Sequence, residues 1–214
     1  MSGPGGPNAP PDRSILLRRG LRLEYVTVGW NLVEGVVAVG AAVVAGSVAL
    51  LGFGADSFVE SASGLVLMWR LMAERRAADP RSIERVESRA LKLVGLSLVL
   101  LAAFIAADAG LTLARGERPE PSPIGIAVTA ISLVVMWWLA RAKRRTARAL
   151  GSRAMQADAF QTTACWWLSL IALAGVGLNA AFGWWWADPV AAIGMTYFLI
   201  KEGLESWRGE AEET

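Results

Sequence analysis

Six apolar stretches, separated by short polar or charged segments, follow one another along this chain of 214 residues. A bilayer core about 30 Å thick is crossed by a helix of about 20 residues, and each stretch is close to that length. The pattern predicts helices over residues 23–45, 47–72, 90–114, 123–140, 152–182 and 189–204. Gly46 marks the turn between the first two, and Pro189 takes a favoured first-turn position in the sixth. We therefore expect an all-α membrane protein with six transmembrane helices.

The basic residues are distributed very unevenly over the ends of these helices. Of the 21 Lys and Arg residues, all but Arg115 and Arg118 lie before the first helix or near the inner ends of the second, fourth and sixth. Cytoplasmic loops of membrane proteins carry this excess of positive charge. We expect both termini in the cytoplasm, and a multi-pass protein of the cell (inner) membrane in contact with lipid. Because the basic residues bound apolar segments, they do not form a face for nucleic acid.

Composition narrows the possible functions further. Hydrophobic residues make up 54% of the chain and charged residues 19%, and there is one Cys and no His. This excludes a disulfide scaffold and removes the commonest general base, so we expect neither an enzyme nor an organic cofactor. The Gly- and Pro-rich start favours a disordered tail over residues 1–21. The transmembrane domain then covers 22–208, and 209–214 form a short acidic tail.

Five carboxylates fall well inside the predicted spans. They are Glu34, Asp56, Glu60, Asp108 and Asp158. A carboxylate in a transmembrane segment is costly and indicates function by default. Since no Lys or Arg within the predicted spans neutralises them, we expect a metal ion, a proton or water to do so.

Two of the helices each present a polar face. Asp56 and Glu60 are four residues apart in the second, and like charges this close in a low dielectric favour a bound cation or a proton. Asp158, Gln161 and Cys165 share one face of the fifth helix, where thiolate and carbonyl oxygen suit a zinc-like ion. The alternatives are a protonated pair that joins helices, and a Cys that is simply a small buried apolar residue.

Depth connects these two faces. Asp56 lies about nine residues from the outer end of its helix, and Gln161 about nine from the inner end of its own, or ~14 Å in each case. Both clusters are therefore predicted near the middle of the bilayer, in one shared site. Asn31 and Glu34 of the first helix are candidates to face the same cavity, in a packing role or as ligands. Asp188 is expected to cap the start of the sixth helix.

Four segments carry a resemblance to a known family: NLVEG, GSVALLGFGADSFVES, ADAFQTTAC and WWWADPVAA. With six helices, residues 22–207 resemble the cation diffusion facilitators. The resemblance implies a homodimeric antiporter of divalent cations and protons, with a metal site at Asp56, Glu60, Gln161 and Cys165. Where the family usually has His-x-x-x-Asp or Asp-x-x-x-Asp in the fifth helix, this chain has Gln and Cys, and Glu60 replaces the usual Asp. The chain is also expected to be a short form, lacking the cytoplasmic C-terminal domain.

These observations predict an exporter of a divalent metal cation, with zinc the preferred assignment, driven by inward protons. Alternating access would occur around the midplane site, and Asp158 would be a fifth metal ligand or a waiting position on the inward path. The rival hypothesis is a non-transporting relative that acts as a membrane sensor or assembly partner. An enzyme with an intramembrane metal site is less favoured, because without His few residues are available to activate water.

Overall fold

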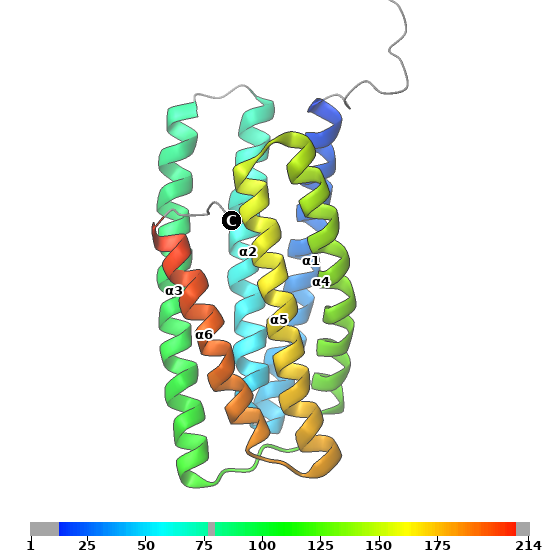
Figure 1. Ribbon diagram of the computed structural model, residues 1–214, viewed down its shortest axis with the longest axis vertical. Coiled ribbons are helices and arrows are strands. Elements are labelled where there is room, and N and C mark those ends of the chain that lie inside the picture. Colours follow the sequence, from blue (N-terminus) through cyan, green and yellow to red (C-terminus); the bar gives the residue numbers. More distant parts are fainter. Residues whose placement is uncertain (1–12, 77–79, 209–214) are drawn as a thin grey trace, which may run out of the picture.

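The computed structural model describes residues 13–76 and 80–208, and all of its regular structure is helical (Figure 1). The helices are α1 (Arg13–Ala45), α2 (Val48–Arg75), α3 (Pro80–Arg115), α4 (Pro123–Leu150), α5 (Arg153–Phe182) and α6 (Ala187–Arg208). Five of them, α1 to α5, are long and apolar enough to cross a membrane. The shorter α6 carries Lys201, Glu202 and Glu205 in its second half. The expected all-α membrane fold is confirmed.

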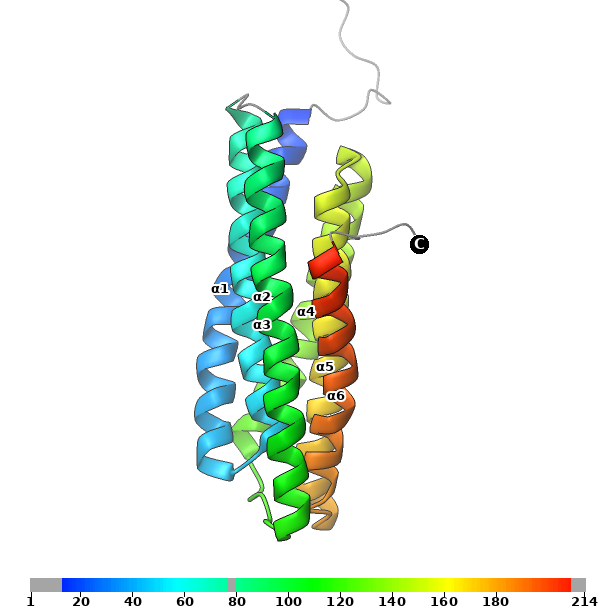
Figure 2. The ribbon, with the colours of Figure 1, turned by 90° about the vertical axis from the view of Figure 1, so that its left-hand side faces the viewer.

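The helices form two layers of three. Figure 2 shows α1, α2 and α3 on one side and α4, α5 and α6 on the other. Neighbours within a layer pack together, and α1 with α4, α2 with α5 and α3 with α6 pack across the boundary. The two helices with paired polar residues, α2 and α5, are thus the middle members of the two layers.

Several helices extend beyond their apolar stretches. α1 begins at Arg13 instead of residue 23, so residues 13–21 are helical and not a tail; residues 1–12 and 209–214 lie outside the described residues. α4 runs to Leu150 instead of residue 140 and ends where Gly151 adopts φ 62° and its N–H bonds back to Ala147 and Arg148. Hydropathy locates the bilayer segment, whereas backbone hydrogen bonding continues until a cap ends the helix.

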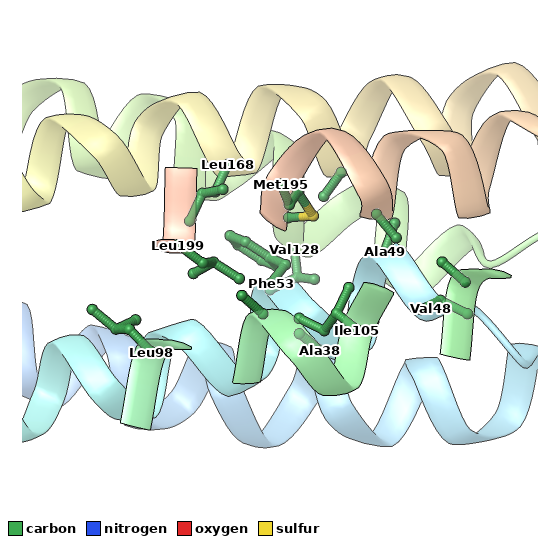
Figure 3. Packing of buried hydrophobic residues seen from close by; sticks show 14 residues of the cluster. Ala38, Val48, Ala49, Phe53, Leu98, Ile105, Val128, Leu168, Met195 and Leu199 are labelled. Carbon is green, nitrogen blue, oxygen red and sulfur yellow. The ribbon is translucent and has the colours of Figure 1, made fainter. Parts of the chain in front are cut away.

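The apolar core lies between the layers. Phe53 of α2 packs with Ile105 of α3, Leu168 of α5, and Met195 and Leu199 of α6, all of them buried (Figure 3). Because these residues come from four helices, this cluster holds α6 against the bundle. The face of α6 that carries Met195 and Leu199 is therefore its inner face.

Helices α1 and α2 approach very closely. A Cβ atom added at Gly54 would lie 2.9 Å from the backbone nitrogen of Val39, and one at Gly35 would lie 2.9 Å from the Phe58 ring. Only glycine permits this separation, and small residues at helix contacts allow such close packing in membrane proteins. At Gly40, by contrast, an added Cβ meets nothing within 4 Å.

The sequence led us to expect that Asp188 caps its own helix, but it does not. α6 begins one residue earlier, at Ala187. The Asp188 carboxylate accepts hydrogen bonds from the Ser47 hydroxyl at 2.5 Å and from the Val48 N–H at 3.0 Å. It therefore caps the N-terminus of α2, where unpaired N–H groups and the helix dipole favour negative charge, and it ties the start of α6 to α2.

Candidate cation site

The polar faces of α2 and α5 meet inside the bundle. The Cys165 thiol donates a hydrogen bond to Oδ2 of Asp56 with a sulfur–oxygen distance of 3.1 Å. Both side chains are buried, at 3% and 2% exposure. The depth argument from the sequence placed these two clusters in one plane, and this contact joins them directly.

One helical turn along, Glu60 faces α5 as well. Thr162 donates to Oε1 of Glu60 at 2.9 Å, whereas Oε2 of Glu60 is buried and makes no hydrogen bond to any described residue. Gln161, the predicted neighbour of Cys165, is also buried. Thr162 was not among the predicted site residues. Its position next to Gln161 on the polar part of α5 could have indicated that it contacts the site.

A carboxylate of α6 joins this cluster and was missed by the sequence reasoning. Glu202 is buried, and neither of its carboxylate oxygens has a hydrogen-bond partner in the part of the chain that the structure describes. It interacts electrostatically with Asp56 and Glu60, and Gln161 is a further polar neighbour. The signal was present in the sequence, because Glu202 continues the inner face of α6 three residues after Leu199.

The expectation that no Lys or Arg neutralises the intramembrane carboxylates is wrong for Asp158. Lys143 of α4 is fully buried, with its Nζ 2.5 Å from Oδ2 of Asp158 and 3.1 Å from Oε2 of Glu24. The sequence placed this lysine in a basic loop after the fourth helix. Since α4 continues to Leu150, the helical period turns Lys143 inward while its neighbour Arg144 stays exposed.

Glu34 has hydrogen-bond partners from three helices. Its carboxylate accepts from Trp30 Nε1 at 2.5 Å, from Ser57 Oγ at 2.7 Å and from Ser132 Oγ. These bonds connect α1 to α2 and α4, so Glu34 fills a structural position. Asn31, one turn away, is fully buried, and its side-chain amide makes no hydrogen bond to the described residues.

A family comparison accounts for this arrangement. The model of the cation efflux transmembrane domain matches residues 25–210, which is most of the chain. The chain belongs to the cation efflux family. The family is one of cation transporters, and this chain carries its transmembrane domain, with five helices long and apolar enough to cross a membrane.

One relative of this cation efflux domain supports the same assignment. The chain is 29% identical over 190 residues to an uncharacterized transporter from Synechocystis sp.. The match covers 86% of this chain and 60% of the relative, so the chain spans little more than half of that protein's length.

In this structure of the cation efflux domain, side-chain hydrogen bonds connect the polar residues of α2 to those of α5. Within residues 13–76 and 80–208, no three His, Cys, Asp or Glu side chains converge closely enough to hold a metal ion. Instead, Cys165 bonds to Asp56 and Thr162 to Glu60. A cation that reaches this site must replace these two hydrogen bonds, and it finds carboxylate oxygens and a sulfur there, which are ligands that zinc-like ions accept.

Proposed function

We propose that this protein exports a divalent transition-metal cation, zinc or a similar ion, in exchange for protons. The ion is held by Asp56 and Glu60 of α2 together with Gln161 and Cys165 of α5. The observation that carries the proposal is the 3.1 Å contact between Cys165 and Asp56, which joins the two polar helices in the bundle interior. Buried carboxylates in a protein of the cation efflux family give this contact a transport role.

The donor set provides the coupling chemistry. Cysteine binds metal as the thiolate, so loading the ion releases the proton that Cys165 now donates to Asp56. Any proton carried by Asp56 or Glu60 leaves in the same step. Protons arriving from the other side then compete for the same atoms and displace the ion, which couples outward metal movement to inward proton movement.

Asp158 takes a different role from the four ligands in this proposal. Its pairing with Lys143 occupies it at a level nearer the start of α5 than Gln161 and Cys165. We assign it to a waiting position on the path from the cytoplasm. An incoming cation competes there with the Lys143 ammonium before it reaches Glu60.

The two-layer architecture suits alternating access. The proposed ligands on α2 and α5 face one another across the boundary between the layers, so a small rocking of one layer against the other opens the site to either side. A homodimer in the cell (inner) membrane, with both termini in the cytoplasm, completes the proposal.

Transport by purified protein in sealed lipid vesicles tests the proposal. Wild-type protein should move Zn²⁺ into the vesicle lumen faster when the lumen is acidic, because protons leave as metal enters. Asp56→Asn should abolish this flux, since it removes a charge from the proposed ligand set. Asp108→Asn is the matched control, because Asp108 is a half-buried carboxylate on α3 and should leave the flux near the wild-type rate.

Two results would count against transport by this site. Folded wild-type protein that moves neither Zn²⁺, Cd²⁺ nor Mn²⁺ under any pH gradient would favour the rival hypothesis of a sensor or assembly partner. Normal flux in Asp56→Asn would mean that the site lies elsewhere.

A further inference from the structure

Most buried carboxylates of the bundle interior have a hydrogen-bond donor or a cation that stabilises them. Glu34 accepts from three side-chain donors, Asp188 caps α2, and Asp158 is paired with Lys143. Asp56 accepts from the Cys165 thiol, and one oxygen of Glu60 accepts from Thr162. Glu202 differs from all of these, because within residues 13–76 and 80–208 its buried oxygens have neither a hydrogen bond nor an ion pair, and Gln161 is its neutral polar neighbour.

The packing of α6 directs Glu202 toward the α2–α5 contact. Gly203 lies against α3, where an added Cβ atom would be 2.8 Å from the carbonyl oxygen of Gly95. This close approach fixes the rotation of α6, and successive residues of a helix point about 100° apart. Glu202 therefore follows Leu199 on the inner face, and it is only 7% exposed.

None of the Lys and Arg side chains that the structure describes pairs with Glu202. Its electrostatic neighbours include the carboxylates of Asp56 and Glu60, and it also interacts electrostatically with the Cys165 thiol. Lys143 is the one buried Lys or Arg side chain among the described residues, and it already pairs with Glu24 and Asp158. An uncompensated carboxylate beside two others is costly in a low dielectric, and a divalent cation among the three removes that cost.

We infer that Glu202 is a further ligand of the transported cation, so that the site is formed by three helices, α2, α5 and α6. This inference rests on the proposed function and deepens it. Glu202 adds a carboxylate oxygen to a set that otherwise includes a thiolate and an amide. Oxygen ligands favour harder ions such as Mn²⁺, whereas sulfur favours Cd²⁺. Glu202 thus favours Mn²⁺ and Cys165 favours Cd²⁺ at the same site.

Metal binding by the purified full-length protein in lipid nanodiscs tests this inference. Titration calorimetry with Mn²⁺, Zn²⁺ and Cd²⁺ compares wild type with Glu202→Gln. We expect the mutant to bind Mn²⁺ at least about tenfold more weakly, as for removal of groups that support a metal site, and Cd²⁺ to be affected least. Glu117→Gln is the control, because Glu117 is an exposed carboxylate beyond the end of α3 that pairs with Arg115 at 3.4 Å. It should bind all three ions as wild type does.

A gain-of-function variant keeps the test decisive if Glu202→Gln folds poorly. Glu202→Cys places a second thiol in the site, and we expect Cd²⁺ affinity to rise above that of wild type while Mn²⁺ affinity falls. Because exposed thiols of a misfolded chain also bind Cd²⁺, the rise supports the inference only if it is lost when Asp56→Asn is added to Glu202→Cys.

The outcomes separate this inference from the proposed function. If wild type binds metal, Asp56→Asn does not, and both Glu202 variants bind like wild type, the inference is overturned and the α2–α5 site stands; Glu202 then carries a proton and not a metal ion. If Asp56→Asn binds like wild type, the proposed site itself fails, and the assignment of Glu202 fails with it.

Discussion

The interior of this bundle holds an unusual number of ionisable side chains, and they are stabilised in different ways. Glu34 and Asp188 are held by neutral donors, and Glu24 and Asp158 share a single lysine. Groups fixed by several partners on different helices connect the bundle. Glu202, whose oxygens have no hydrogen bond among the described residues, is the carboxylate that we assign to the cation.

Replacement of Cys165 should change metal preference more than stability. Cys165→Ser retains a donor to Asp56 but removes the soft sulfur ligand. We expect Cd²⁺ and Zn²⁺ flux into vesicles to fall by about tenfold or more, with a smaller effect on Mn²⁺. Thr163→Ser, a mild change on the same helix, is the control and should leave all three fluxes unchanged. Equal loss of all three ions in Cys165→Ser would contradict a ligand role for the thiol.

Lys143 should be essential for folding stability. Lys143→Met leaves Glu24 and Asp158 buried without their cation. Breaking a buried ion pair from one side costs about 3–5 kcal/mol, and we expect a loss of this size in the free energy of unfolding, measured by denaturation in detergent.

Two further variants test whether the loss of stability in Lys143→Met comes from the broken ion pair. Lys201→Met removes an exposed lysine paired with Glu205 and should change the free energy of unfolding by less than about 1 kcal/mol. Adding Asp158→Asn to Lys143→Met should recover part of the stability, because it removes one of the unpaired charges. If Lys143→Met unfolded like wild type, the buried ion pair would not be part of the native bundle.

At the scale of the helices, contacts of small residues set the spacing between neighbouring helices, both within a layer and between the two layers. Gly54 and Gly35 let α1 and α2 approach until side chain and backbone touch, and Gly203 does the same for α6 against α3. Close packing of this kind is a main source of stability where lipid removes the hydrophobic drive between helices.

A pair of glycine substitutions measures this effect. Gly54→Ala forces a Cβ atom to within 2.9 Å of the Val39 nitrogen, so the helices must move apart. We expect a loss of about 1–3 kcal/mol in the free energy of unfolding, as for other overpacked sites. Gly40→Ala makes the same chemical change on an exposed face of α1 with nothing within 4 Å and should be neutral or slightly stabilising. Equal effects of the two would show that helix propensity, and not close packing, governs these positions.

At the scale of the whole molecule, the described ends of the chain lie toward the same end of the bundle. Figure 1 shows the start of α1 and the end of α6 in its upper half, with the end of α2, the start of α3 and the α4–α5 connection also toward the top. The basic residues of the sequence concentrate at this end, and the rule that positive charge stays inside predicts that it faces the cytoplasm.

Cysteine labelling in intact cells tests this orientation. In a Cys165→Ser background, Ala149→Cys near the end of α4 and Glu120→Cys before α4 place exposed thiols at opposite ends of the bundle. A maleimide that cannot cross membranes should label Glu120→Cys in whole cells, and Ala149→Cys only after the membrane is opened. Labelling of Ala149→Cys in whole cells would reverse the predicted orientation.

The sequence by itself determined the helical architecture and the two central polar faces. Hydrophobic length and charge distribution are local properties, so they identify six helices without knowledge of their neighbours. The spacing of Asp56 and Glu60, and of Gln161 and Cys165, fixes a common face on each helix in the same way. The depth argument placed Asp56 level with Gln161, and in the structure Asp56 meets Cys165, one turn further along α5, at 3.1 Å.

Only the tertiary structure decided which other charged residues enter the interior. The sequence pattern predicts that Lys143 is one of several basic residues in a loop and that Glu202 belongs to a polar helix end. Their burial depends on how far α4 continues and how α6 is rotated against α3, which are set by a glycine cap and a glycine contact between helices. Pattern along the chain fixes which residues share a helix face, but the partner that the face meets is fixed by packing between segments distant in the sequence.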